Sequence, residues 1–336
     1  MFKFVRSSSF TAQVMIPVIG FLLFAAGWFL PARLAPGELY GNGYYYLPTD
    51  GLFYNWLKLL VTLPLWVQVV PTLLLAVISA LSLVHEDTRH LLLGRRCYGI
   101  AYVYLFLVAS SGYLLLAHPA FLAGYLMLLG TGFVLDLFKN ESKFDLVFGY
   151  CFTWGLAALI YPPVAVVLPV IIIGLAVMVS TVWRHWIVAL AGLILPALIS
   201  VTVLYLTGDL QYEVSSYLQW FRLRTTWPPD FLIREPFLFV WFGILLFWII
   251  IASVNYRNPK IQSRQLFLVN FFQFLFLLAM ALGLETVSVE VLWLLLVPVT
   301  YLMTLWALEV RRGWVRDLFF LSLLASFIFF RIRGLV

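Results

Sequence analysis

The sequence has few charged residues and few of the side chains that bind metals. Of its 336 residues, 11% are charged, four are histidine and two are cysteine, whereas soluble chains have roughly 25% charged residues. Cys97 and Cys151 alone predict neither a disulfide framework nor a thiolate metal site. Phosphate-cradling glycine loops, Walker lysines and nucleophile elbows are also missing, so the chain is not predicted to hydrolyse nucleotides.

Apolar residues are abundant instead. They make up 64% of the chain, and no polar stretch is long enough to form a separate soluble domain. The sequence therefore predicts an all-α, polytopic transmembrane helical bundle that forms a single integral membrane domain over residues 1–336. The net charge is +6, but the Lys and Arg residues lie in short loops between apolar runs. This placement favours membrane lipid head groups over nucleic acid as partners, and no cofactor is predicted.

With about 20 apolar residues per span, the sequence predicts ten to eleven spans. They are placed near residues 13–30, 59–83, 97–116, 119–137, 145–161, 163–182, 187–206, 237–254, 265–283, 290–308 and 317–330. The last stretch is short for a full crossing. It is read as a short span, a tilted half-helix or an interfacial piece.

The orientation is predicted from the stretch Asp136 to Pro163, which forms a helical hairpin with a charged turn. Lys139 and Lys143 mark that turn as cytoplasmic, because positive residues accumulate on the inner side. This places the N-terminus in the cytoplasm, where Lys3 and Arg6 precede a first helix that we expect to be retained. In this orientation the cytoplasmic side receives twice as many Lys and Arg residues as the outer side.

Two predicted outer segments, 31–58 and 207–236, are longer than the other connections. The first is rich in Gly, Pro and Tyr, which argues against a continuous helix. In the second, apolar residues from Leu210 to Phe221 recur at helical spacing with polar residues opposite. This pattern predicts an amphipathic helix in the outer membrane interface, extending to Arg224, with Leu218 and Phe221 on its apolar face.

Glu38 and Asp50, both in the first outer segment, are the candidate catalytic residues. A carboxylate at the outer membrane surface is placed to act as a general base or a metal ligand on the head group of a lipid-linked substrate. The alternative is that both are solvated loop carboxylates beside glycine turns.

Arg222, Arg224 and Arg234, in the second outer segment, are the candidate phosphate-binding residues. The planar guanidinium binds phosphate through two parallel hydrogen bonds, and arginines on this side run against the positive-inside bias. The alternative is an interfacial helix whose arginines reach head groups and pair with nearby acids.

Other ionisable residues are predicted to have structural roles. Asp136 and Asp145 flank the hairpin turn beside Lys139 and Lys143, which favours helix-end pairing over a proton relay. Glu285 and Glu290, in a short outer turn, are interpreted in the same way.

The stretch HEDTRH, from His85 to His90, is placed in a cytoplasmic loop. Two histidines five residues apart do not share a helix face, and His118 and His185 are predicted on opposite sides of the membrane. No metal site is therefore predicted.

Between His85 and Asp209, the turn NESKFD with its following helix to YPP, and the turn WRHW, resemble a family of polytopic inner-membrane proteins from Bacteroidota. The family's function is not known, and the resemblance implies a Gram-negative inner membrane. The order of parts is also similar to the GT-C glycosyltransferases, which use polyprenyl-phosphate sugar donors. That similarity implies a catalytic carboxylate in the first outer loop, which here is Glu38 or Asp50, although an adjacent acidic pair is missing.

Two hypotheses for the function stay open. In one, the protein is a bacterial inner-membrane enzyme that acts on lipid-linked envelope intermediates, as a glycosyltransferase dependent on polyprenyl phosphate. In the other, it is a non-catalytic membrane subunit or a lipid-handling protein of an envelope assembly, with membrane-protein partners. A transporter is a third alternative, although no inverted repeat is visible and no charge lies in the middle of a span.

Overall fold

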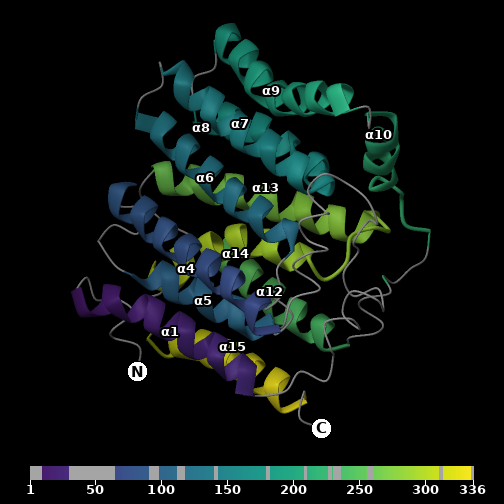
Figure 1. Ribbon diagram of the computed structural model, residues 1–336. Helices are drawn as coiled ribbons and strands as arrows, with labels where there is room; N and C mark the ends of the chain where they lie inside the picture. The colour runs from purple at the N-terminus through teal and green to yellow at the C-terminus, as the bar shows by residue number, and fades with distance from the viewer. Residues whose placement is uncertain are drawn as a thin grey trace.

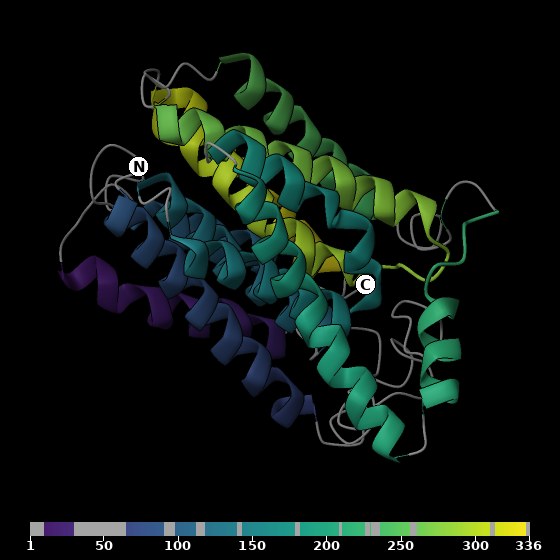
Figure 2. The same ribbon diagram turned by 90° about the horizontal axis from the view of Figure 1, so that it is seen from above.

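The chain forms a bundle of helices, shown in two views of a computed structural model (Figures 1 and 2). The structure describes residues 10–29, 65–90, 98–111, 118–139, 143–178, 182–207, 210–225, 229, 236–255, 261–309 and 313–333. Within these ranges every regular element is helical, and the one β-type pairing is an isolated antiparallel bridge between Leu223 and Leu284. The prediction of an all-α fold is confirmed.

The described helices closely follow the apolar runs of the sequence. They are α1 (Phe10–Phe29), α4 (Leu65–His90), α5 (Gly99–Ser111), α6 (Pro119–Lys139), α7 (Phe144–Ile160), the 3-10 helix η2 (Pro162–Val167), α8 (Pro169–Met178), α9 (Trp183–Thr207), α10 (Leu210–Gln219), α12 (Pro236–Asn255), α13 (Ile261–Gly283), α14 (Val291–Glu309) and α15 (Gly313–Arg333).

The long helices lie side by side, with α9 at one edge of the bundle and α1 and α15 at the opposite edge (Figure 1). We name the two ends of the bundle by residues that lie there. The Asp136 end is where α4 and α6 finish and α13 begins, since Gln262 lies beside His90 there. The Glu290 end is where α4 and α6 begin and α13 finishes, and α10 stands across it (Figure 1).

Four described helices are long and apolar enough to cross a membrane: Val69–His90, Pro119–Phe138, Trp183–Leu206 and Ile261–Gly283. They differ in how far they are buried inside the protein. Only 22% of the membrane-length stretch of α9 is buried inside the protein, whereas 67% of the corresponding stretch of α6 is buried. Large apolar side chains such as Leu190, Leu198 and Leu206 are exposed along α9. This helix therefore presents an apolar surface that water does not solvate well.

Helix α14 forms the centre of the bundle. Every residue from Val291 to Thr304 is buried, and the helix packs against α5, α6, α12 and α13. On the α6 side, the Phe121 ring stacks on Trp293 with 3.8 Å between ring centroids. A Cβ atom at Gly124 would lie 3.0 Å from the Trp293 carbonyl oxygen, so glycine allows the two helices to approach closely. A sequence that is apolar all round the helix suits this fully buried position.

One helix ends at a pair of prolines as predicted, whereas two others are longer than predicted. Helix α7 ends at Ile160, before Pro162 and Pro163, as predicted, and the chain continues as η2 before α8. Helix α4 extends to His90, beyond the predicted end at residue 83. The stretch HEDTRH is therefore helical, and the prediction that it lies in a loop is wrong. Helix α15 spans 21 residues, longer than the predicted stretch 317–330.

The amphipathic helix α10 is confirmed only in part. It covers Leu210–Gln219, with Leu218 and Gln219 exposed, and does not continue to Arg224 as predicted. From Trp220 the chain turns and then runs extended, because its backbone pairs with the connection between α13 and α14. The tertiary pairing supplies the backbone hydrogen bonds that a longer helix would have formed.

Candidate functional site

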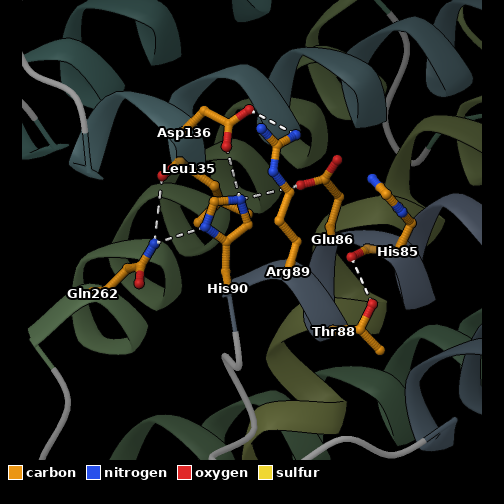
Figure 3. A network of polar contacts seen from close by, with 8 residues as sticks. All are labelled: His85, Glu86, Thr88, Arg89, His90, Leu135, Asp136 and Gln262. Carbon is orange, nitrogen blue, oxygen red and sulfur yellow. Dashed lines mark hydrogen bonds and ion pairs between the residues drawn. The ribbon is translucent and has the colours of Figure 1, made fainter.

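At the Asp136 end, charged side chains of α4 and α6 form the network drawn in Figure 3. One carboxylate oxygen of Asp136 lies 3.0 Å from the Arg89 guanidinium, and the other lies 3.2 Å from Nε2 of His90. The same ring nitrogen lies 3.5 Å from Glu86, one helical turn earlier on α4. Gln262 of α13 places its amide nitrogen 3.4 Å from His90 Nδ1. The network therefore joins three helices.

Most of this network is closed to solvent. The side chain of His90 is 0% exposed and that of Asp136 is 11% exposed, whereas Arg89 reaches solvent at 52%. A Cβ atom at Gly132 would lie 2.6 Å from the Glu86 carboxylate, so glycine at this position leaves room for that side chain between α4 and α6. Buried charges persist only when they are paired, which explains why the acids and bases meet here.

The pairing of Asp136 differs from the prediction. The sequence predicts Lys139 and Lys143 as its partners, but its carboxylate faces Arg89 and His90 across the helix interface. The reason is the extra length of α4, whose last turns run beside the end of α6. Asp145, at the start of α7, is exposed.

The described residues do not bring three or more His, Cys, Asp or Glu side chains into an arrangement that could hold a metal ion. Two of the histidines, His118 and His185, also lie at opposite ends of the bundle. His118 lies against the Tyr161 ring at the Glu290 end, whereas His185 lies against Phe144 at the Asp136 end. The two histidines therefore lie at opposite ends of the bundle, and their placement on opposite sides of a membrane stays a prediction.

A second polar cluster surrounds Glu290 at the opposite end. Its Oε1 accepts a hydrogen bond of 3.1 Å from the Tyr161 hydroxyl and one of 2.9 Å from the backbone N–H of Ser288. Glu290 itself is 0% exposed. Tyr161 lies just after α7, and its ring also packs edge-on against His118 and Trp220. The carboxyl therefore connects the end of α7 to the start of α14.

The arginine segment, defined as residues 220–225, is held against the same connection by its backbone. The Arg224 N–H donates to the Gly283 carbonyl at 2.8 Å, and the Glu285 N–H donates to the Arg222 carbonyl at 3.0 Å. The Arg224 guanidinium donates to the carbonyls of Leu284 and Val287 at 2.8 and 3.0 Å. These bonds fix the position of both arginines at the Glu290 end.

Burial controls the charge of Glu290. Removal from water raises the pKa of this carboxyl to about 8, although its hydrogen bonds and the positive charge of Arg224 act in the opposite direction. The group is thus mostly protonated at neutral pH and ionises in mildly alkaline solution. A carboxyl with this behaviour can hold or release a proton under ordinary conditions.

The predicted site residues are described unevenly by the structure. Glu38, Asp50 and Arg234 lie outside the described residues. Arg222 is exposed, and no hydrogen bond or ion pair from the described part of the chain engages its guanidinium. Arg224 is partly buried and contacts the loop carbonyls. Two of the three predicted arginines are therefore adjacent at one end of the bundle.

Glu290 is the residue whose environment the sequence does not reveal. The sequence predicts a helix-end carboxylate of a short turn, but Glu290 is fully buried and hydrogen-bonded to a residue 129 positions away. The sequence gives one indication that Glu290 is buried, because the stretch before it, from Thr286 to Val289, has no charged residue. At the Asp136 end, Glu86 and His90 are four residues apart. Because α4 extends to His90, this spacing places both side chains on the same face of the helix.

No protein-family model, curated protein or solved structure matches this chain. The roles of the two polar clusters therefore rest on their geometry alone.

Proposed function

We propose that the protein is a multi-pass protein of the bacterial inner membrane with its N-terminus in the cytoplasm. The support is the set of four apolar helices of membrane-spanning length, together with exposed apolar side chains along α9. The charges agree with this orientation. Exposed Lys143, Arg184 and Arg264 lie at the Asp136 end, which is then the cytoplasmic end, and the Glu290 end faces outward.

Thiol labelling in intact cells tests this orientation. In versions with Cys97 and Cys151 removed, Gln219→Cys is expected to react with a membrane-impermeant maleimide from outside. Asp145→Cys is expected to react only after the cells are opened. Both positions are exposed and lie at opposite ends of the bundle, so accessibility within the protein does not bias the comparison. Labelling of Asp145→Cys in intact cells would reverse the topology.

For the activity, we propose that the outer end binds a lipid-linked envelope intermediate and transfers its sugar from polyprenyl phosphate. The observation that carries the proposal is the arginine segment, which is fixed by backbone hydrogen bonds at the end of the bundle where α1 finishes and α4 begins. The connection between those helices contains Glu38 and Asp50. This connection therefore leaves α1 and joins α4 at the same end of the bundle as Arg222 and Arg224.

The proposed reaction assigns each group a role. Glu38 or Asp50 accepts the proton of the acceptor hydroxyl as its oxygen attacks the anomeric carbon of the sugar. The bond from that carbon to the phosphate oxygen breaks, and polyprenyl phosphate leaves as an anion. Arg222, Arg224 and Arg234 stabilise the negative charge of the leaving phosphate through hydrogen bonds. Each step conserves charge without a metal ion or a nucleotide.

Ligand binding by the purified protein tests the first half of this proposal. A short-chain polyprenyl phosphate is expected to raise the Tm of the wild-type protein in detergent, and Arg222→Ala is expected to weaken binding about tenfold, as loss of a charged hydrogen bond does. Arg264→Ala is the matched control, because Arg264 is an exposed arginine at the opposite end. Equal losses in the two variants would show that the lipid does not use the arginine segment.

The catalytic half is tested in cells. The double variant Glu38→Ala with Asp50→Asn is expected to abolish glycan transfer while the protein accumulates normally, because a general base contributes to the reaction rather than to folding. If the envelope glycans stay unchanged in this variant while deletion of the whole protein disrupts an envelope complex, the non-catalytic subunit becomes the better hypothesis.

A further inference from the structure

We propose that Glu290 is a positioning residue that sets the anion affinity of the arginine segment through a single proton. This inference rests on the proposed binding of a phosphate head group at the same end of the bundle. It assigns to the site a dependence on pH that neither the arginines nor the ligand would give by themselves.

The geometry places the carboxyl and the arginine on one short loop. Residues 284–290 connect α13 to α14, and the Arg224 guanidinium donates to two carbonyls of this loop. Glu290 closes the loop from the other side, through the backbone N–H of Ser288. Arg224 and Glu290 are close enough to interact electrostatically. A change of charge on one therefore acts directly on the other.

One oxygen of the Glu290 carboxyl makes no hydrogen bond with the described residues. Oε1 accepts two hydrogen bonds, whereas Oε2 is buried and makes none with the described residues. An ionised carboxylate in this position would be a buried charge with one oxygen that accepts no hydrogen bond from the described residues. The protonated form needs fewer partners, so the local structure favours it.

The other ionisable groups around Glu290 come from three directions. Tyr161 faces it from the end of α7, Arg224 from the arginine segment, and Glu285 lies at the start of the same loop. His118, at the start of α6, contacts the Tyr161 ring rather than Glu290. Of the described groups, Arg224 is the nearby cation, and it keeps its charge at every pH of interest.

The protonation state of Glu290 determines how strongly Arg224 attracts an incoming anion. With Glu290 protonated, the neutral carboxyl does not weaken the attraction of Arg224 for phosphate. With Glu290 ionised, a negative charge beside the guanidinium offsets it. A unit charge that interacts with the guanidinium is expected to change anion affinity by about tenfold. Affinity is therefore expected to fall as pH rises past 8.

The experiment measures binding of a short-chain polyprenyl phosphate to the full-length protein at pH 7 and pH 9.5. A phosphate monoester is already close to its full charge at pH 7, so changes in the ligand do not explain weaker binding at higher pH. Wild-type affinity is expected to fall about tenfold over this range. Glu290→Gln keeps the size and the oxygen acceptor of the side chain but cannot ionise, so its affinity is expected to stay constant.

A measurement without ligand separates the two proposals. Because the folded pKa of Glu290 lies above the ordinary value of 4.5, wild-type stability is highest below that pH and falls as pH rises to about 8. The Tm difference between wild type and Glu290→Gln should change in that window. This change shows that Glu290 titrates in the folded protein whether or not a lipid binds.

The outcomes are distinguishable. Failure of the wild type to bind the lipid at either pH overturns the proposed function. Binding that weakens equally in wild type and Glu290→Gln overturns the role of Glu290 and leaves the proposed function intact. Arg224→Gln provides a second variant. It is expected to bind more weakly at pH 7 and to lose most of the pH dependence, and a retained tenfold dependence would also overturn the inference.

Discussion

Replacing Gly155 by leucine is expected to destabilise the protein strongly, by about 3 kcal/mol or more, because α7 and α9 touch at this residue. A Cβ atom on Gly155 would lie 2.7 Å from the Leu193 carbonyl oxygen. A second close approach joins the same two helices, since a Cβ atom on Gly192 of α9 would lie 2.7 Å from the Phe148 carbonyl oxygen. Backbone atoms cannot rotate away as side chains do, so the two helices must separate. Small residues at a helix crossing are a common means of close packing in membrane proteins.

The matched control for Gly155→Leu is Gly243→Leu. Gly243 lies on α12 and is exposed, and a Cβ atom added there would have no neighbouring atom within 4 Å. Its substitution should leave the Tm in detergent almost unchanged, with a small gain from helix propensity. Gly155→Ala should lie between the two, because the methyl group already makes the close contact. Equal Tm values for Gly155→Leu and Gly243→Leu would contradict the close packing of α7 on α9.

Replacing Asp136 by alanine is expected to cost about 2 to 3 kcal/mol, because it leaves the buried His90 without its partner on α6. Asp136 lies 3.0 Å from Arg89 and 3.2 Å from His90, and its removal breaks the polar link between α4 and α6. The Tm should fall by several degrees. Proteolysis at the Asp136 end should become faster, since the two helix ends are no longer joined.

Asp145→Ala is the control for this prediction, since Asp145 lies close by in sequence but is exposed. It should change stability by no more than about 0.5 kcal/mol. A double-mutant cycle of Asp136→Asn and His90→Gln would measure the coupling directly, and an energy near zero would show that the 3.2 Å contact does not contribute.

Much of the fold could be predicted from the sequence because apolar runs of membrane-spanning length have few alternatives to the helix. The break at Tyr161, the hairpin of α6 and α7, and the opposite placement of His118 and His185 all follow from local features. Errors at helix ends, such as the extension of α4 through HEDTRH, arise because a charged stretch after an apolar run is typical of a loop. Such a stretch stays helical when a neighbouring helix provides partners, as Asp136 does for His90.

The candidate site was less predictable. The sequence pointed to an arginine-bearing segment at one end of the bundle, and Arg222 and Arg224 lie together there. It did not show that Arg224 is bound to the loop before α14, nor that Glu290, the last residue of that loop, is buried. A carboxylate in a short turn looks the same in sequence whether water or protein surrounds it.

The sequence by itself determined which segments are helical, because backbone groups in apolar segments must satisfy one another along the chain. The tertiary structure alone decided which helix is central and which charges meet. Helices such as α9 and α14 are apolar on every face, so their sequences do not distinguish the exposed edge of the bundle from its core. Packing places α14 inside and brings Tyr161 to Glu290 and Asp136 to His90. These contacts join residues that are distant in the chain, and no local pattern encodes such pairs.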